Sequence, residues 1–116
     1  MPTRQNTTAA DDLFAALANP TRRAVLSMLL TGDRAAGEIA AHFEMARPSV
    51  SEHLSLLVKR GLISEHRYGR NIRYRLEAEP LLAVSQWLAP FESHWRQHLE
   101  SLHRLLDEEL PRKEHR

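Results

Sequence analysis

The sequence predicts a mainly α-helical domain with one small β-hairpin. Three observations favour this fold class. Apolar residues recur at helical spacing through most of the chain, most clearly at Val50, Leu54, Leu57 and Val58. Between residues 62 and 76 this spacing gives way to the alternation that is typical of β-strands. The chain has 116 residues, of which 42% are hydrophobic, and this suffices for one compact domain with a single core.

The first two helices are separated by Asn19-Pro20. A short helix over residues 11–18 must end there, because the residue before a proline avoids the helical conformation. Asn19 is a good N-cap and Pro20 a good first residue for a second helix, which Gly32 ends. The apolar set of this second helix is Val25, Leu26, Met28, Leu29 and Leu30.

Two further helices and a hairpin follow. A third helix is expected over residues 37–43, and after a short turn a fourth begins at Pro48 and ends at Gly61. Strands are then expected over 62–68 and 72–76, joined by a turn at residues 69–71. In the second strand Ile72, Tyr74 and Leu76 alternate with arginines, which predicts one buried face and one cationic face.

The chain becomes helical again from Glu79, with Pro80 at a harmless position in the first turn. Pro90 is expected to kink or restart this region, giving two segments that meet near Ala89. The sequence thus indicates a disordered segment at residues 1–10, one domain at 11–110, and a polar tail at 111–116.

The formal net charge of +1 conceals an uneven distribution. Residues 1–33 carry three basic and three acidic side chains, residues 34–76 eight and four, and residues 77–116 five and eight. A basic middle segment between neutral and acidic flanks indicates one face that meets a polyanion.

Two short helices joined by a tight turn and followed by a basic hairpin form a winged helix-turn-helix, whose second helix enters the major groove of DNA. We therefore expect DNA contacts from three groups of residues. The recognition helix supplies Arg47, Pro48, Ser49, Ser51, Glu52, His53 and Ser55. The wing supplies Arg67, Tyr68, Arg70, Asn71 and Arg73, and Thr21, Arg22 and Lys59 contact the DNA backbone.

Several classes of protein are excluded by what the sequence lacks. The absence of cysteine excludes disulfides, thiolate metal ligands and a thiol nucleophile. No zinc-protease motif, glycine-rich phosphate loop or serine-hydrolase motif is present, so we expect neither an enzyme nor a cofactor. No apolar run approaches the ~18 residues of a membrane span, and the polar N-terminus is unlike a secretory signal, so a cytoplasmic protein is expected.

Several motifs in register resemble the ArsR/SmtB family of bacterial transcriptional repressors. They are residues 17–22 (LANPTR), 37–40 (GEIA), 48–54 (PSVSEHL), 57–63 (LVKRGLI) and 68–70 (YGR). Trp87-Leu88 and Trp95 are similar to a cysteine-free, SdpR-like subgroup. The resemblance implies a homodimer that binds a palindromic operator until an unknown inducer releases it, and it places the dimer interface on the first and last helices.

The composition of the expected helices agrees with that implication. The late helices carry more large apolar side chains than a small domain covers on one face, and aromatic residues are common interface anchors. The expected dimer interface comprises Leu13, Phe14, Leu17, Leu81, Val84, Trp87, Leu88, Phe91, Trp95, Leu99, Leu102 and Leu106.

Two alternatives remain open from the sequence. Founding members of the resembled family carry a Cys-x-Cys sensor, but Ala35 and Gly37 stand at the matching positions here. His94 and His98 have helical spacing, which leaves a zinc- or nickel-responsive repressor as an alternative, although no metal site is the main expectation. The other alternative is a winged-helix module that binds a protein instead of DNA.

Overall fold

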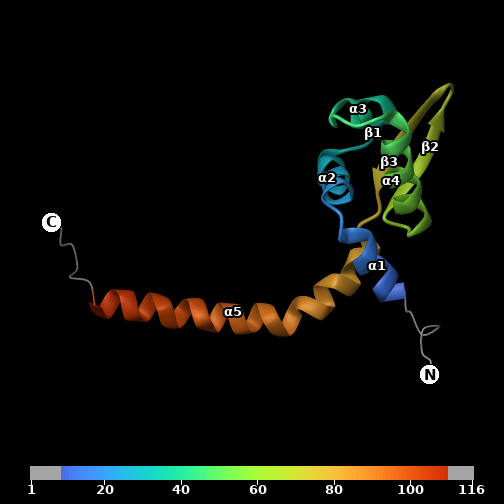
Figure 1. Ribbon diagram of the computed structural model, residues 1–116. Helices are drawn as coiled ribbons and strands as arrows, with labels where there is room; N and C mark the ends of the chain where they lie inside the picture. The colour runs from blue at the N-terminus through green and yellow to red at the C-terminus, as the bar shows by residue number, and fades with distance from the viewer. Residues whose placement is uncertain (1–8, 110–116) are drawn as a thin grey trace. The chain divides into compact units, whose positions relative to one another are not determined.

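The computed structural model describes residues 9–109, and the chain divides into two compact units after Val84. The parts of the expected terminal segments at residues 1–8 and 110–116 lie outside the described residues. The first unit contains α1 (Ala9–Leu17), α2 (Pro20–Met28), β1 (Arg34–Ala35), α3 (Ala36–Ala41), α4 (Arg47–Lys59), β2 (Ile63–Tyr68) and β3 (Asn71–Leu76) (Figure 1). A 3-10 turn, η2 (Leu29–Thr31), follows α2, and another, η3 (Glu79–Leu81), precedes α5 (Leu82–Glu109).

The boundaries of α2 follow the expected capping chemistry. Asn19 has extended backbone angles, and its side chain accepts a hydrogen bond of 3.0 Å from the backbone N–H of Arg22. Pro20 occupies the first turn, and Gly32, with a φ of 141°, lies just beyond η2. Leu30 was expected to belong to the apolar set of this helix, but its side chain is 72% exposed. It lies in the 3-10 turn, where the side-chain period differs from that of an α-helix.

The core of the first unit joins one face of each helix to the small sheet. Val50, Leu54 and Leu57 of α4 are buried, as their spacing predicts, and Val58 is partly buried beside them. Their partners in the same core are Leu13, Ala16, Val25, Leu26, Leu29, Ile39, Ala40, Leu62, Ile63 and Tyr74. The other face of α4 is consequently left in solvent.

The sheet has three antiparallel strands in the order β1-β3-β2, so the expected hairpin gains a short third strand. β1 pairs Arg34 with Tyr74 and Ala35 with Arg73. Because β1 has only two residues, it shows no period that the sequence could reveal. The turn between β2 and β3 is also tighter than expected: Tyr68 pairs with Asn71, which leaves Gly69 and Arg70 as a two-residue turn, and Gly69 has a φ of 64°.

Asp33, just before β1, binds two arginines of β3. Its backbone carbonyl accepts a 3.1 Å hydrogen bond from Arg73, and its carboxylate accepts bonds of 3.2 and 3.0 Å from Nε and a terminal nitrogen of Arg75. The hydrogen bond from Arg75 holds the pKa of the Asp33 carboxyl below its ordinary value. The arginine face expected on the second strand of the hairpin therefore forms internal bonds rather than a row of free cations.

Asp33→Asn is expected to make the stability of the protein less dependent on pH in the acid range. The pKa of Asp33 is lower in the folded chain than in the unfolded one. The ion pair with Arg75 thus stabilises the fold above about pH 4, and this contribution is lost as the pH falls through the folded-state pKa. Urea unfolding at about pH 6 and about pH 3 measures the loss. Equal losses in the wild type and the variant would contradict this assignment.

α5 runs without a break through Pro90, so the expectation of two segments that meet near Ala89 is wrong. A proline removes one backbone hydrogen bond and crowds one carbonyl, and helical turns on both sides outweigh that cost here. Within residues 9–109, no helix combines the length and the apolar character that a membrane crossing requires.

Candidate nucleic-acid interface

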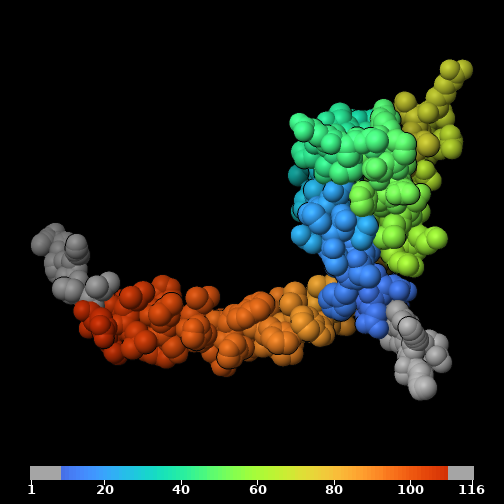
Figure 2. Space-filling view, in the orientation of Figure 1, coloured from blue at the N-terminus to red at the C-terminus, as the bar shows by residue number. Residues whose placement is uncertain are grey.

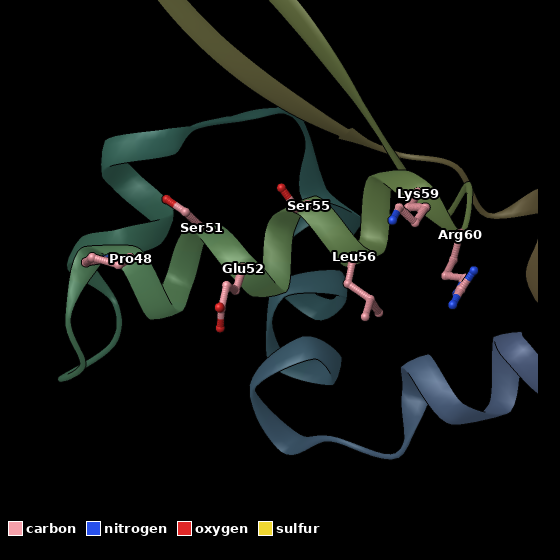
Figure 3. A pocket seen from close by; sticks show the side chains of 7 residues that line it. All are labelled: Pro48, Ser51, Glu52, Ser55, Leu56, Lys59 and Arg60. Carbon is pink, nitrogen blue, oxygen red and sulfur yellow. The ribbon is translucent and has the colours of Figure 1, made fainter.

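The exposed face of α4 forms an open groove in the first unit. Pro48, Glu52, Ser55 and Lys59 follow one another at i, i+4, i+7 and i+11, so they lie along one side of the helix, opposite the core residues. Figure 3 shows this face with Ser51 and Ser55 along one edge and Glu52 and Leu56 along the other edge. The groove is lined by Pro48, Ser51, Glu52, Ser55, Leu56, Lys59 and Arg60.

The expected recognition residues divide into an exposed group and one that turns inward. Arg47, Pro48, Ser49, Ser51, Glu52 and Ser55 are all exposed. His53 is only partly exposed, and its Nδ1 lies 3.2 Å from a terminal nitrogen of Arg22. Leu56 and Arg60 also line the groove, although sequence reasoning missed them; their positions four and eight residues after Glu52 were the available signal.

The first backbone N–H groups of α4 have no side-chain cap. Ala46 precedes the helix in an extended conformation, and its carbonyl accepts bonds from Ser49 and Val50. Helix α4 begins with Arg47, one residue before the expected start at Pro48. An uncapped helix N-terminus beside an arginine is a favourable place for a phosphate group.

The wing stands out from the helical body of the first unit. Figure 2 shows the hairpin between β2 and β3 projecting beyond α3 and α4. Its tip consists of Arg67, Tyr68, Gly69, Arg70 and Asn71, all of which are exposed, and we call these five residues the wing tip. Arg73, expected to contact DNA with them, is only partly exposed, and one of its terminal nitrogens donates to the carbonyl of Asp33 just before β1.

Arg22 was expected to contact the DNA backbone, but the structure engages its guanidinium inside the protein. Nε donates to the carbonyl of Ala16 at 2.7 Å, and a terminal nitrogen donates to that of Ala15 at 3.2 Å. The other terminal nitrogen lies next to His53. Arg22 thus donates hydrogen bonds to carbonyls in the last turn of α1 and links α1 to α4. Thr21, the neighbouring candidate, lies partly exposed in the first turn of α2.

Arg22→Ala is expected to destabilise the fold by about 2 kcal/mol, because hydrogen bonds to a charged group contribute about 1.5–3 kcal/mol and two helix carbonyls lose their donor. The free energy of unfolding in urea measures this loss. Arg23→Ala is the matched control, since Arg23 is exposed and makes one bond of 2.8 Å to the Leu17 carbonyl. Equal destabilisation by the two substitutions would argue against the role of Arg22 in linking α1 to α4.

The lysines and arginines that the structure describes in the first unit fall into two classes. Six of them bond to other parts of the protein: Arg22, Arg23, Arg34, Arg60, Arg73 and Arg75. Four have no side-chain hydrogen bond or ion pair within the described residues: Arg47, Lys59, Arg67 and Arg70. These four lie on α4 and at the wing tip, the two elements that the winged helix-turn-helix places against DNA.

The residues expected at the dimer interface divide into buried or partly buried residues of the first unit and accessible residues of the second. Leu13 is 5% exposed and belongs to the core of the first unit. Leu17, Leu81 and Val84 pack partly against that core, and Phe14 is partly buried. In the second unit the remaining candidates are accessible, and all but the partly buried Leu88 are exposed by 43% to 56%: Trp87, Phe91, Trp95, Leu99, Leu102 and Leu106.

The histidines of α5 form a pair without a third ligand. The rings of His94 and His98 are stacked, with centroids 6.4 Å apart and planes at 12°. Across residues 9–109, the structure brings no three His, Asp or Glu side chains together in a group that could hold a metal ion. Two imidazoles alone fall short of the three or four ligands of a zinc site.

Comparison with known proteins agrees with this geometry. Residues 19–65 match the family described as "Bacterial regulatory protein, arsR family". The chain is 41% identical over 81 residues to the transcriptional repressor SdpR of Bacillus subtilis (strain 168), covering 70% of this chain and 90% of SdpR. It is 43% identical over 87 residues to a probable mercury resistance operon repressor of Streptomyces lividans, covering 75% of this chain and 67% of that one.

A solved structure supports the fold independently. The crystal structure of an ArsR family transcriptional regulator superposes with a TM-score of 0.68 at 40% identity. The match covers 77% of this chain and 98% of that one. The two chains share the mainly helical architecture with its small antiparallel sheet.

Proposed function

Because the chain belongs to the ArsR family of bacterial transcriptional regulators, we propose that it represses transcription as a homodimer bound to a palindromic operator. The family consists of DNA-binding regulators rather than enzymes. The observation that carries the proposal is the separation of the basic residues, since Arg47, Lys59, Arg67 and Arg70 are left free on the two DNA-facing elements. Unpaired cations on both α4 and the wing tip favour DNA as the partner over another protein.

The proposed contacts follow from the positions of the side chains. α4 enters the major groove, where Ser49, Ser51 and Ser55 lie close to base edges and their hydroxyls donate or accept. Arg47, Lys59 and the N-terminus of α4 bind phosphates on either side. The wing tip follows the neighbouring minor groove with Arg67 and Arg70.

Dimerisation lets two copies of this small DNA-binding domain contact both half-sites of one operator. The apolar residues of α5 beyond Val84 are the proposed contact with a second copy. A twofold dimer presents two recognition helices about one turn of DNA apart, or a multiple of it, to a palindromic sequence. As a regulator of bacterial transcription, the dimer acts on DNA in the cytoplasm.

The test is binding to the DNA immediately upstream of the protein's own gene, compared with a scrambled duplex of equal length and composition. Fluorescence anisotropy at increasing salt should show tighter binding to the upstream DNA. The logarithm of the affinity should fall linearly with the logarithm of the salt concentration, because each phosphate contact releases counterions. Affinity that does not change with salt would refute DNA binding, and equal affinity for both duplexes would refute an operator in this upstream DNA.

A further inference from the structure

We propose that Glu52 determines operator specificity by selecting a cytosine in each half-site, an inference that rests on the proposed function. The argument starts from the position of Glu52 on α4. It lies midway along the exposed line formed by Pro48, Ser55 and Lys59, and it lines the groove on that face. On a helix that enters the major groove, this is the part of the surface that lies closest to the base pairs.

The carboxylate of Glu52 is free to take a partner from outside the protein. Among residues 9–109, no hydrogen bond or ion pair involves the carboxylate of Glu52, in contrast to those of Asp12 and Asp33, which pair with Arg60 and Arg75. The residues three and four positions away along α4 are Ser49, Ser55, Pro48 and Leu56, none of which is basic. Lys59 is seven residues away, about 10 Å along the helix, so it does not neutralise Glu52 by direct contact.

A free carboxylate is unfavourable in a DNA groove unless a base donates a hydrogen bond to it. The phosphates repel it, and it has acceptors only. In the major groove guanine presents N7 and O6, and thymine presents O4, all of which are acceptors. The only donors there are the amino groups of cytosine N4 and adenine N6. Adenine places its N7 acceptor next to the amino group, where it repels the second oxygen of the carboxylate, whereas cytosine carries no major-groove acceptor. We therefore expect the carboxylate of Glu52 to accept a hydrogen bond from the amino group of cytosine.

This preference has a defined chemical opposite. A glutamine at the same position keeps the shape of the side chain and gains a donor, and glutamine pairs with N6 and N7 of adenine. Glu52→Gln should thus replace a preference for cytosine with one for adenine at a single position in each half-site. A merely repulsive acid would behave differently, because its removal would raise the affinity for every sequence alike.

The experiment is a selection from a pool of duplexes with a randomised central region, using the purified full chain and sequencing of the bound fraction. The wild type should enrich a palindromic motif with a fixed cytosine in each half. Glu52→Gln should retain the rest of the motif and exchange that base for adenine. Titrations of two duplexes that differ only at this base pair should show about tenfold tighter binding of the cytosine duplex by the wild type, and a loss or reversal of this ratio in the variant.

Glu44→Gln is the matched control, since Glu44 is an exposed acid in the turn before α4 and the same charge is removed. It should leave the selected motif unchanged. If Glu52→Gln selects the same motif as the wild type, the specificity role of Glu52 is overturned while the proposed function stands. If the wild type enriches no sequence at all, operator binding fails and the inference fails with it.

Discussion

Replacing Arg67 and Arg70 together with alanine is expected to reduce operator affinity by about one to two orders of magnitude at moderate salt. Both side chains are exposed at the wing tip and have no partner among the described residues, so their charges are available to DNA. Each phosphate contact that is lost lowers the slope of log affinity against log salt by about 0.9. Because the dimer carries both arginines in each copy, the double variant should lose about 3.6 units of slope.

A charge-matched control separates contact from net charge. Arg96 and Arg104 are exposed on α5, and their replacement with alanine removes the same two charges from a surface outside the proposed interface. This control should change the slope little. A similar loss of slope in both double variants would show that overall charge, rather than the wing tip, sets the salt dependence.

The second large effect concerns the aromatic residues of α5. Phe91 lies between Trp87 and Trp95, with ring centroids 4.8 and 6.4 Å away, and the three rings form one exposed apolar surface. Truncation of a buried Phe or Trp to alanine costs about 3–5 kcal/mol. If this surface is the dimer contact, Phe91→Ala and Trp95→Ala together should raise the dimer dissociation constant by more than about 1,000-fold, since each change counts in both copies.

Sedimentation equilibrium over a range of protein concentrations measures this constant. Ser93→Ala with Gln97→Ala is the control, because Ser93 and Gln97 lie on the opposite side of α5 from Phe91 and Trp95. The control should remain dimeric at concentrations at which the aromatic variant is monomeric. A wild type that sediments as a monomer at micromolar concentrations would contradict the proposed dimer.

Local chemistry made much of the fold predictable. Asn19 and Pro20 define the start of α2 through capping, and the apolar spacing of α4 places Val50, Leu54 and Leu57 in the core. The alternation in β3 likewise predicts the burial of Tyr74. Each of these rests on residues close together in the chain, whose period or capping role is visible in the sequence alone.

Several departures from expectation, those of Arg22, Arg73 and Leu13, originate in contacts between residues distant in the chain. Arg75 binds Asp33, which is 42 residues away, and Arg22 lies next to His53, 31 residues away. A run of arginines does not reveal which of them will meet an acid or a helix end from another element. The structure engages Arg22 and Arg73 in internal hydrogen bonds, and among the described residues the side chains of Arg47, Lys59, Arg67 and Arg70 have no such partner. The burial of Leu13, expected at an interface, has the same origin.

The apolar stripe of α5 has a consequence for the shape of a dimer built on it. Val84, Trp95 and Leu106 stand eleven residues apart, and so do Leu88 and Leu99, and Phe91 and Leu102. An eleven-residue repeat corresponds to about 3.67 residues per turn, close to the 3.6 of an undistorted helix, whereas a seven-residue repeat forces a left-handed supercoil. Two copies of α5 joined along this stripe would lie nearly straight or with a slight right-handed coil. The twist of this helix pair would depend on how regular α5 is on either side of Pro90.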